Sequence, residues 1–243
     1  MKSPPMRSRR REAGLTLMEV LVAVALLSLL SAGILVALRV GSAAWQSANT
    51  NLTLDRRIAT ANTILNSALE GIFPAMAEFN DPATRSQTTA VLFQGEPQSM
   101  RFVTSYSLES GPRSGLRLVE LQVVDGPKGR RVLLNEQIYD GPRAAGRVVT
   151  GVARTRSVAG MRLLFAPILT QPNSFVIADE LESCVFTYRT PPQFDRPDRW
   201  DPAWEDPYSL PSAVSIQITP RQNSARLRPV PVTVPIRSTF FSL

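Results

Sequence analysis

The sequence predicts an α+β fold, with one long N-terminal helix followed by a mainly antiparallel, β-rich C-terminal domain. The first observation is a run of 19 uncharged residues from Val20 to Leu38, roughly 28 Å of helix at about 1.5 Å per residue. The second is an apolar spacing that continues at helical intervals beyond this run. The third is a change, from about residue 87, to short strand-like runs separated by Gly and Pro. The 243 residues leave room for one membrane helix and one domain of ordinary size.

The uncharged run is long enough to cross a bilayer, whose hydrocarbon core is about 30 Å thick. The leader, residues 1–14, contains five basic residues and one acidic residue, so it holds +4 of the chain's formal charge of +7. Basic residues flanking a first membrane helix stay in the cytoplasm, which predicts a C-terminal domain on the outer side of the membrane. Because the positive charge gathers in the leader, the high pI does not predict nucleic-acid binding. The basic residues are Lys2, Arg7, Arg9, Arg10 and Arg11.

The helix is predicted to continue past the membrane segment, from about Thr16 to about Gly71. After Arg39 the apolar residues recur at spacings that keep to one helical face, with polar residues between them. Gly71 and Pro74 then supply a stop. The alternative is two helices with a break near Gly41 and Ser42. The apolar residues of this face are Trp45, Leu52, Ile58, Leu65, Leu69 and Ile72.

From about residue 87, eight short runs are predicted to be strands, and Gly-Pro turn signals lie between several of them. The alternation in 116–123 is typical of a sheet with one face exposed. Short connections favour antiparallel pairing. The predicted strands are Thr89–Gln94, Met100–Ser107, Leu116–Val124, Arg131–Ile138, Met161–Phe165, Val185–Arg189, Ala213–Thr219 and Val230–Thr239.

Composition argues against an enzyme. The chain has no histidine, which removes the commonest general base and metal ligand. It has no Gly-x-Ser-x-Gly element and no phosphate-binding loop. A membrane-tethered glycosidase that uses only carboxylates stays open as an alternative. The single cysteine, Cys184, alternates with Phe186 and Tyr188 along a predicted strand, so we expect a buried thiol.

An acidic loop at 196–207 contains two tryptophans, Trp200 and Trp204. Clustered carboxylates could bind calcium, but their spacing fits no recognised loop motif. We therefore expect no metal and no cofactor here. Because tryptophan in a polar loop either covers its own domain or anchors an interface, Trp200 and Trp204 are candidates for partner contact or loop packing.

An ordinary secretory signal is cut after its apolar stretch, whereas the candidate cleavage residue of this chain, Gly14, precedes the apolar helix. Gly14, Thr16, Leu17, Glu19 and the following Val20–Ala23 resemble the N-terminal signal of type IV pilins and type II secretion pseudopilins. The family most often has Phe where this chain has Leu15. The resemblance implies that prepilin peptidase cuts between Gly14 and Leu15 and that the new amine of Leu15 is methylated. It also implies that Glu19 pairs with the N-terminal amine of a neighbouring subunit and sets axial register during assembly.

The β-rich half resembles the minor pseudopilin J family of the type II secretion system. The resemblance implies a structural subunit, without catalysis, in the tip complex of a periplasmic pseudopilus. Its implied partners are minor pseudopilins I and K, the major pseudopilin and prepilin peptidase. A minor pilin of a type IV pilus is the alternative. The residues that carry the resemblance are Leu92–Gly95, Met100–Thr104, Gly115–Leu121, Phe186–Tyr188, Trp200, Trp204 and Leu210–Val214.

The expected organisation has three parts. Residues 1–14 form a leader that prepilin peptidase removes, and residues 15–72 form the long helix, which crosses the inner membrane at about 18–38. Residues 73–243 form a periplasmic pseudopilin domain of β-rich structure.

Overall fold

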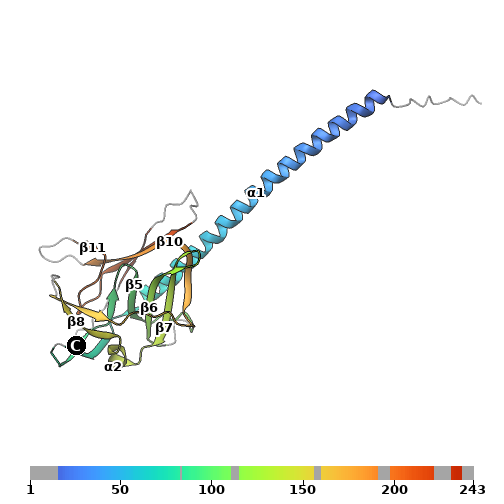
Figure 1. Ribbon diagram of the computed structural model, residues 1–243. Coiled ribbons are helices and arrows are strands. Elements are labelled where there is room, and N and C mark those ends of the chain that lie inside the picture. Colours follow the sequence, from blue (N-terminus) through green and yellow to red (C-terminus); the bar gives the residue numbers. More distant parts are fainter. Residues whose placement is uncertain are drawn as a thin grey trace, which may run out of the picture. The chain divides into compact units, whose positions relative to one another are not determined.

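The computed structural model describes residues 16–82, 84–110, 115–155, 160–190, 198–221 and 231–236. The chain divides into two compact units, Met1–Thr53 and Leu54–Leu243. Each unit is described by itself below. The α+β fold class is confirmed, because a long apolar helix precedes a mainly antiparallel sheet (Figure 1).

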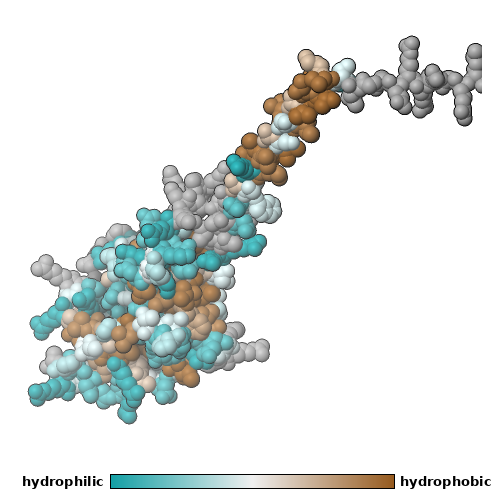
Figure 2. All heavy atoms as spheres, turned by 45° about the vertical axis from the view of Figure 1, so that its right-hand side comes forward, coloured by the Kyte–Doolittle hydropathy of each residue, from teal (hydrophilic) through white to brown (hydrophobic). Residues whose placement is uncertain are grey.

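Helix α1 (Leu17–Glu70) is one helix of 54 residues, so the alternative of a break near Gly41 and Ser42 is wrong. Its segment Leu17–Gln46 is long and apolar enough to cross a membrane. Figure 2 shows an apolar surface along this part of the helix. The segment is exposed in the single chain, and Trp45 at its end is 76% exposed. Trp45 lies on the continuous helix as predicted. The side chain of Leu52 lies outside the described residues.

Within the second unit, the last four turns of α1 bury a narrower face than the sequence predicted. Leu65 and Leu69 are fully buried as predicted, whereas Ile58 is only half-buried. Two alanines, Ala61 and Ala68, complete this face, and both are fully buried. Because these side chains are small, the helix backbone can lie close to the sheet. The predicted face contained only large apolar residues, so it did not include the two alanines.

Within the described residues the main sheet has nine strands, and all of their pairings are antiparallel. Its order is β1-β5-β6-β7-β10-β12-β13, with β4 paired to β5 and β11 paired to β10. The strands are β1 (Ile72–Phe73), β4 (Phe93–Gly95), β5 (Ser99–Thr104), β6 (Arg117–Gly126), β7 (Gly129–Ile138), β10 (Phe175–Thr190), β11 (Arg199–Asp201), β12 (Ala213–Pro220) and β13 (Val232–Pro235).

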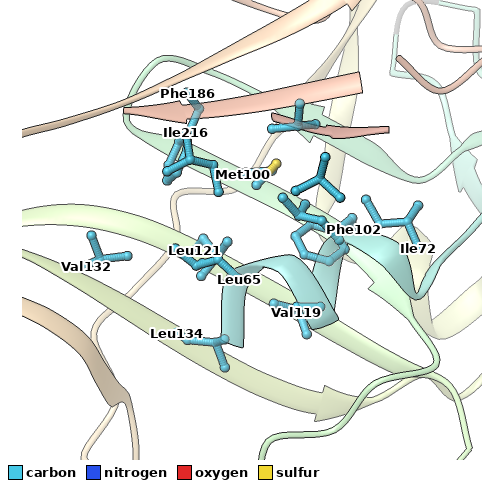
Figure 3. Close-up of a cluster of buried hydrophobic side chains, with 14 of the residues drawn as sticks. Leu65, Ile72, Met100, Phe102, Val119, Leu121, Val132, Leu134, Phe186 and Ile216 are labelled. Carbon is cyan, nitrogen blue, oxygen red and sulfur yellow. The ribbon is translucent and has the colours of Figure 1, made fainter. Parts of the chain in front are cut away.

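The two faces of this sheet bury two different apolar clusters. On the first face, Leu65 of α1 packs with Phe102, Leu121 and Leu134 of the central strands (Figure 3). On the second face, a further cluster joins the sheet to two hairpins and a short helix. These elements are β2 (Met76–Asn80) with β3 (Gln87–Val91), β8 (Val149–Arg154) with β9 (Met161–Phe165), and α2 (Gly141–Gly146).

Strand β10 is the longest strand and changes partners along its length. Its first part pairs with β7 and its second part pairs with β12. The change falls near Glu180, whose backbone is left-handed at a φ of 56°. Since a non-glycine residue rarely adopts this conformation, Glu180 marks a local bend imposed by the pairing on both sides.

Most predicted strands are present, with five differences. The predicted strand Thr89–Gln94 is two strands, β3 and β4, which belong to different sheets. Strands β1, β2, β8 and β11 were not predicted, and α2 replaces a predicted turn. Strand β10 begins ten residues before the predicted Val185, because pairing with β7 extends it through an acidic stretch. Strand β13 covers only part of 230–239, of which residues 230 and 237–239 lie outside the described residues.

Replacing Gly146 with alanine is expected to destabilise the fold by about 2–3 kcal/mol, as overpacking of a tight contact does. A Cβ at this position would lie 1.9 Å from the carbonyl oxygen of Glu78 in β2. Because the obstacle is backbone, no side-chain rotation relieves it. Chemical denaturation of the full chain in detergent checks the effect. Gly151→Ala is the matched control, since its Cβ would meet only Pro82, at 3.6 Å. Equal stability of both variants would contradict this account.

Candidate functional site

The N-terminal candidate site begins at the edge of the described residues. Gly14 and Leu15, the predicted cleavage and methylation residues, lie outside them. Thr16 is the first described residue, and α1 begins at Leu17. The hydroxyl of Thr16 accepts a hydrogen bond from the backbone N–H of Glu19 at 3.3 Å. Thr16 is therefore the N-cap of α1, and its carbonyl oxygen accepts the same N–H at 3.0 Å.

Sequence reasoning missed the role of Thr16, although the sequence contains a signal for it. Threonine followed three residues later by glutamate, ahead of an apolar run, is the pattern of a capping box. Glu19 thus lies in the first turn of α1, where the helix dipole favours a carboxylate. It is exposed and is the only charged residue between Thr16 and Arg39.

The structure gives the two predicted tryptophans different environments. Trp204 is half-buried and packs against the main core. Its backbone N–H donates to the carbonyl of Gly95 at 2.9 Å, and its indole N–H donates to the carbonyl of Ser209 at 3.0 Å. Trp200 lies on β11 and is 45% exposed. Trp204 therefore holds its loop on the domain, which leaves Trp200 as the more accessible of the two. Both tryptophans lie in the unit Leu54–Leu243, whereas the third candidate residue, Glu19, lies in the unit Met1–Thr53.

The carboxylates around these tryptophans contact groups of the domain itself. Asp198 pairs with Arg189, and Asp201 pairs with Arg199 at 2.9 Å. Glu205 accepts a hydrogen bond from the hydroxyl of Thr155 at 2.6 Å. Among residues 198–221 and the other described ranges, no group of three or more His, Cys, Asp or Glu side chains could hold a metal ion. These carboxylates act in folding the loop.

Sequence reasoning also missed a buried polar network on the second face of the sheet. Arg101 of β5 is 1% exposed, and its Nε donates to Glu120 of β6 at 2.7 Å. Its two other nitrogens donate to the side chain of Gln94 at 2.7 Å and to the carbonyl of Ala166 at 3.2 Å. The guanidinium also lies over the ring of Phe165 at 5.7 Å. A buried ion pair of this kind requires such additional partners.

The network continues through Asn135 of β7 to the segment 166–174. The amide nitrogen of Asn135 donates to Glu120 at 3.1 Å and to the carbonyl of Leu169 at 2.9 Å. Its amide oxygen accepts the hydroxyl of Ser174 at 2.6 Å. The prediction of a sheet with one exposed face is therefore wrong around Glu120. The β8–β9 hairpin and the segment after it cover that face. No local sequence pattern signals this burial, because it depends on the pairing of Arg101 with Glu120 across two strands.

Cys184 is buried as predicted, with no exposed surface, and Phe186 and Tyr188 are equally buried on the same strand. Burial raises the pKa of the Cys184 thiol to about 12. Since the thiolate is the reactive form, this cysteine is an inert part of the core near neutral pH.

Comparison with known families identifies the N-terminal segment. The model of the prokaryotic N-terminal methylation motif matches residues 9–35, which include Gly14, Thr16 and Glu19. No curated protein matches the chain. The motif lies at the start of a helix able to cross a membrane, and that helix precedes a mainly antiparallel β domain. These findings together indicate that the chain is a type IV pilin-like protein with a prepilin-type N-terminus.

Proposed function

We propose that this chain is a minor pseudopilin of the type II secretion system, in the J subfamily, and acts in the tip complex of the periplasmic pseudopilus. The observation that carries the proposal is the methylation motif at the start of α1, a helix whose last turns are built into the core of a β domain. This architecture supplies two assembly surfaces, an apolar helix and a folded head. The J-like stretches support the subfamily, and they lie on β4, β5, β6, β10, β11 and β12 or beside these strands.

In this proposal, prepilin peptidase cuts between Gly14 and Leu15, and the amine of Leu15 is then methylated. The basic leader keeps the N-terminus in the cytoplasm, and α1 anchors the chain in the inner membrane. The β domain is periplasmic. Glu19 pairs with the N-terminal amine of a neighbouring subunit. A charge pair within an apolar environment serves better to define register than to add stability. The subunit carries out no catalysis.

Co-purification from the native cells tests the proposed function. The full chain is tagged at its C-terminus, extracted in detergent and captured, and its partners are identified by mass spectrometry. Recovery of minor pseudopilins I and K, with the leader removed after Gly14, is the expected result. Recovery of minor pilins of a type IV pilus without I and K would overturn the proposal. That result would move the chain to a pilus, where priming, adhesion or DNA uptake would be its task.

Replacing Trp200 with alanine is expected to reduce recovery of the tip partners about fivefold or more, as loss of an aromatic interface anchor does. Trp200 is the middle residue of the three-residue strand β11, and its side chain is 45% exposed. The residues on either side of it, Arg199 and Asp201, form an ion pair with each other. Tyr208→Ala is the matched control, because Tyr208 is 57% exposed and lies in the same loop region. Unchanged recovery with Trp200→Ala would remove Trp200 from the interface. The circular dichroism spectrum should be the same for both variants.

A further inference from the structure

Trp45 is a large exposed side chain on a part of α1 whose other residues are small or polar. It is 76% exposed, and within the described part of the chain it belongs to neither apolar cluster. One turn before it lies Gly41, where an added Cβ would meet nothing within 4 Å. Between Gly41 and Asn51 the remaining residues are Ala, Ser, Gln, Asn and Thr. The position of Trp45 along the helix indicates what covers its ring.

The charged residues of α1 define which part of the helix lies in the hydrocarbon core of the membrane. Glu19 and Arg39 are the first charges on the two sides of the uncharged run Val20–Leu38. The rise from Glu19 to Arg39 is roughly 30 Å at about 1.5 Å per residue. The hydrocarbon core of a bilayer is also about 30 Å thick. Because a charge inside the core is costly, Arg39 lies at the core edge nearer the β domain in sequence.

This placement puts Trp45 in the headgroup layer. Trp45 follows Arg39 by about 9 Å along the helix axis. A side chain on an α-helix leans toward the N-terminus of the helix, which brings the indole back toward the core edge. The headgroup layer beyond that edge is roughly 5–8 Å thick. The next charge after Arg39 is Asp55, so no charged residue near Trp45 disfavours this depth.

We propose that Trp45 binds the phospholipid headgroup layer at the end of the membrane segment that leads to the β domain. The apolar ring covers the upper part of the acyl chains, and the indole N–H donates to ester or phosphate oxygens of the lipids. Movement of α1 outward would expose the ring to water, and movement inward would carry Arg39 into the core. This inference rests on the membrane crossing in the proposed function and on no protein partner.

Fluorescence quenching of the full chain in vesicles tests the depth of Trp45. The vesicles contain phosphatidylcholine and phosphatidylglycerol, with a nitroxide quencher either on the headgroup or near the ends of the acyl chains. The headgroup nitroxide should quench the native chain about twofold more strongly than the nitroxide near the chain ends, as expected for an interfacial tryptophan. Trp45→Phe should lose this difference, since Trp200 and Trp204 belong to the other compact unit, Leu54–Leu243.

A tryptophan at the middle of the uncharged run provides the matched control. Leu29 is midway between Glu19 and Arg39 and is 73% exposed. Leu29→Trp is introduced together with Trp45→Phe. In this double variant the nitroxide near the chain ends should be the stronger quencher, because residue 29 lies at the centre of the core.

The control separates failure of this inference from failure of the proposed function. If Leu29→Trp is quenched as expected but the headgroup nitroxide quenches the native chain no more than Trp45→Phe, the binding of Trp45 to the headgroup layer is overturned. Stronger quenching of the native chain by the nitroxide near the chain ends would overturn it too, because the ring would then lie in the core. If the nitroxide near the chain ends does not quench Leu29→Trp, α1 does not cross the membrane, and the proposed function fails together with this inference.

Discussion

Replacing Arg101 with methionine is expected to lower the free energy of unfolding by about 3–5 kcal/mol, the usual cost of removing one partner from a buried ion pair. Methionine fills a similar volume but leaves the carboxylate of Glu120, which is 5% exposed, without its 2.7 Å partner. It also removes the donors to Gln94 and to the carbonyl of Ala166. Urea denaturation of the full chain in detergent, followed by tryptophan fluorescence, measures the effect.

The double variant Arg101→Met with Glu120→Leu separates the unpaired charge from lost packing. If the buried carboxylate causes most of the loss, the double variant should regain at least about half of it. Arg57→Met is the matched control, because Arg57 pairs with Asp179 at 3.3 Å at the surface. An exposed pair of this kind contributes about 0–1 kcal/mol. A double variant no more stable than Arg101→Met would contradict the role given to the charge.

The network explains how the segment 166–174 keeps a fixed path without regular structure. Its carbonyls at Ala166 and Leu169 accept hydrogen bonds from Arg101 and Asn135, and Ser174 donates to Asn135. These bonds fix the segment on the sheet through polar side chains of two strands, β5 and β7. Because buried polar groups accept only partners of the right geometry, the network specifies one arrangement of this layer.

The sequence predicted the parts of the fold that depend on local pattern. The uncharged run and the Gly71 stop predicted one long helix, and α1 ends at Glu70. Alternation over 116–123 predicted a strand at Leu116–Val124, and β6 spans Arg117–Gly126. At the candidate site, the motif around Glu19 identified the segment that the methylation model matches.

The remaining features depend on contacts between distant residues, which a local pattern does not contain. Glu120 has the sequence pattern of an exposed strand residue, yet the pairing with Arg101 and the layer above bury it. Strand β10 passes through Asp179 and Glu180, which have low strand propensity, because β7 and β12 pair with it on either side of a bend. Ala68 is buried because the helix lies close to the sheet, which no property of alanine predicts.

Replacing Glu19 with leucine is expected to leave cleavage after Gly14 largely intact while reducing assembly more than tenfold. Removal of a carboxylate from an apolar helix makes insertion into the membrane more favourable, so a loss of assembly could not come from failed insertion. The N-cap should also survive, since Thr16 bonds the backbone N–H of residue 19 and not its side chain. What the variant lacks is the negative charge proposed to pair with the amine of a neighbouring subunit.

Two further variants identify the charge as the cause. Glu19→Gln keeps the shape without the charge and should assemble as poorly as Glu19→Leu, whereas Glu19→Asp keeps the charge on a shorter side chain and should recover part of the assembly. Processing is measured as the mass of the chain after membrane extraction. Assembly is measured as co-purified pseudopilins from the same cells. Normal assembly of Glu19→Leu would refute the register role. Assembly of Glu19→Gln at the native level would show that shape matters at this position and charge does not.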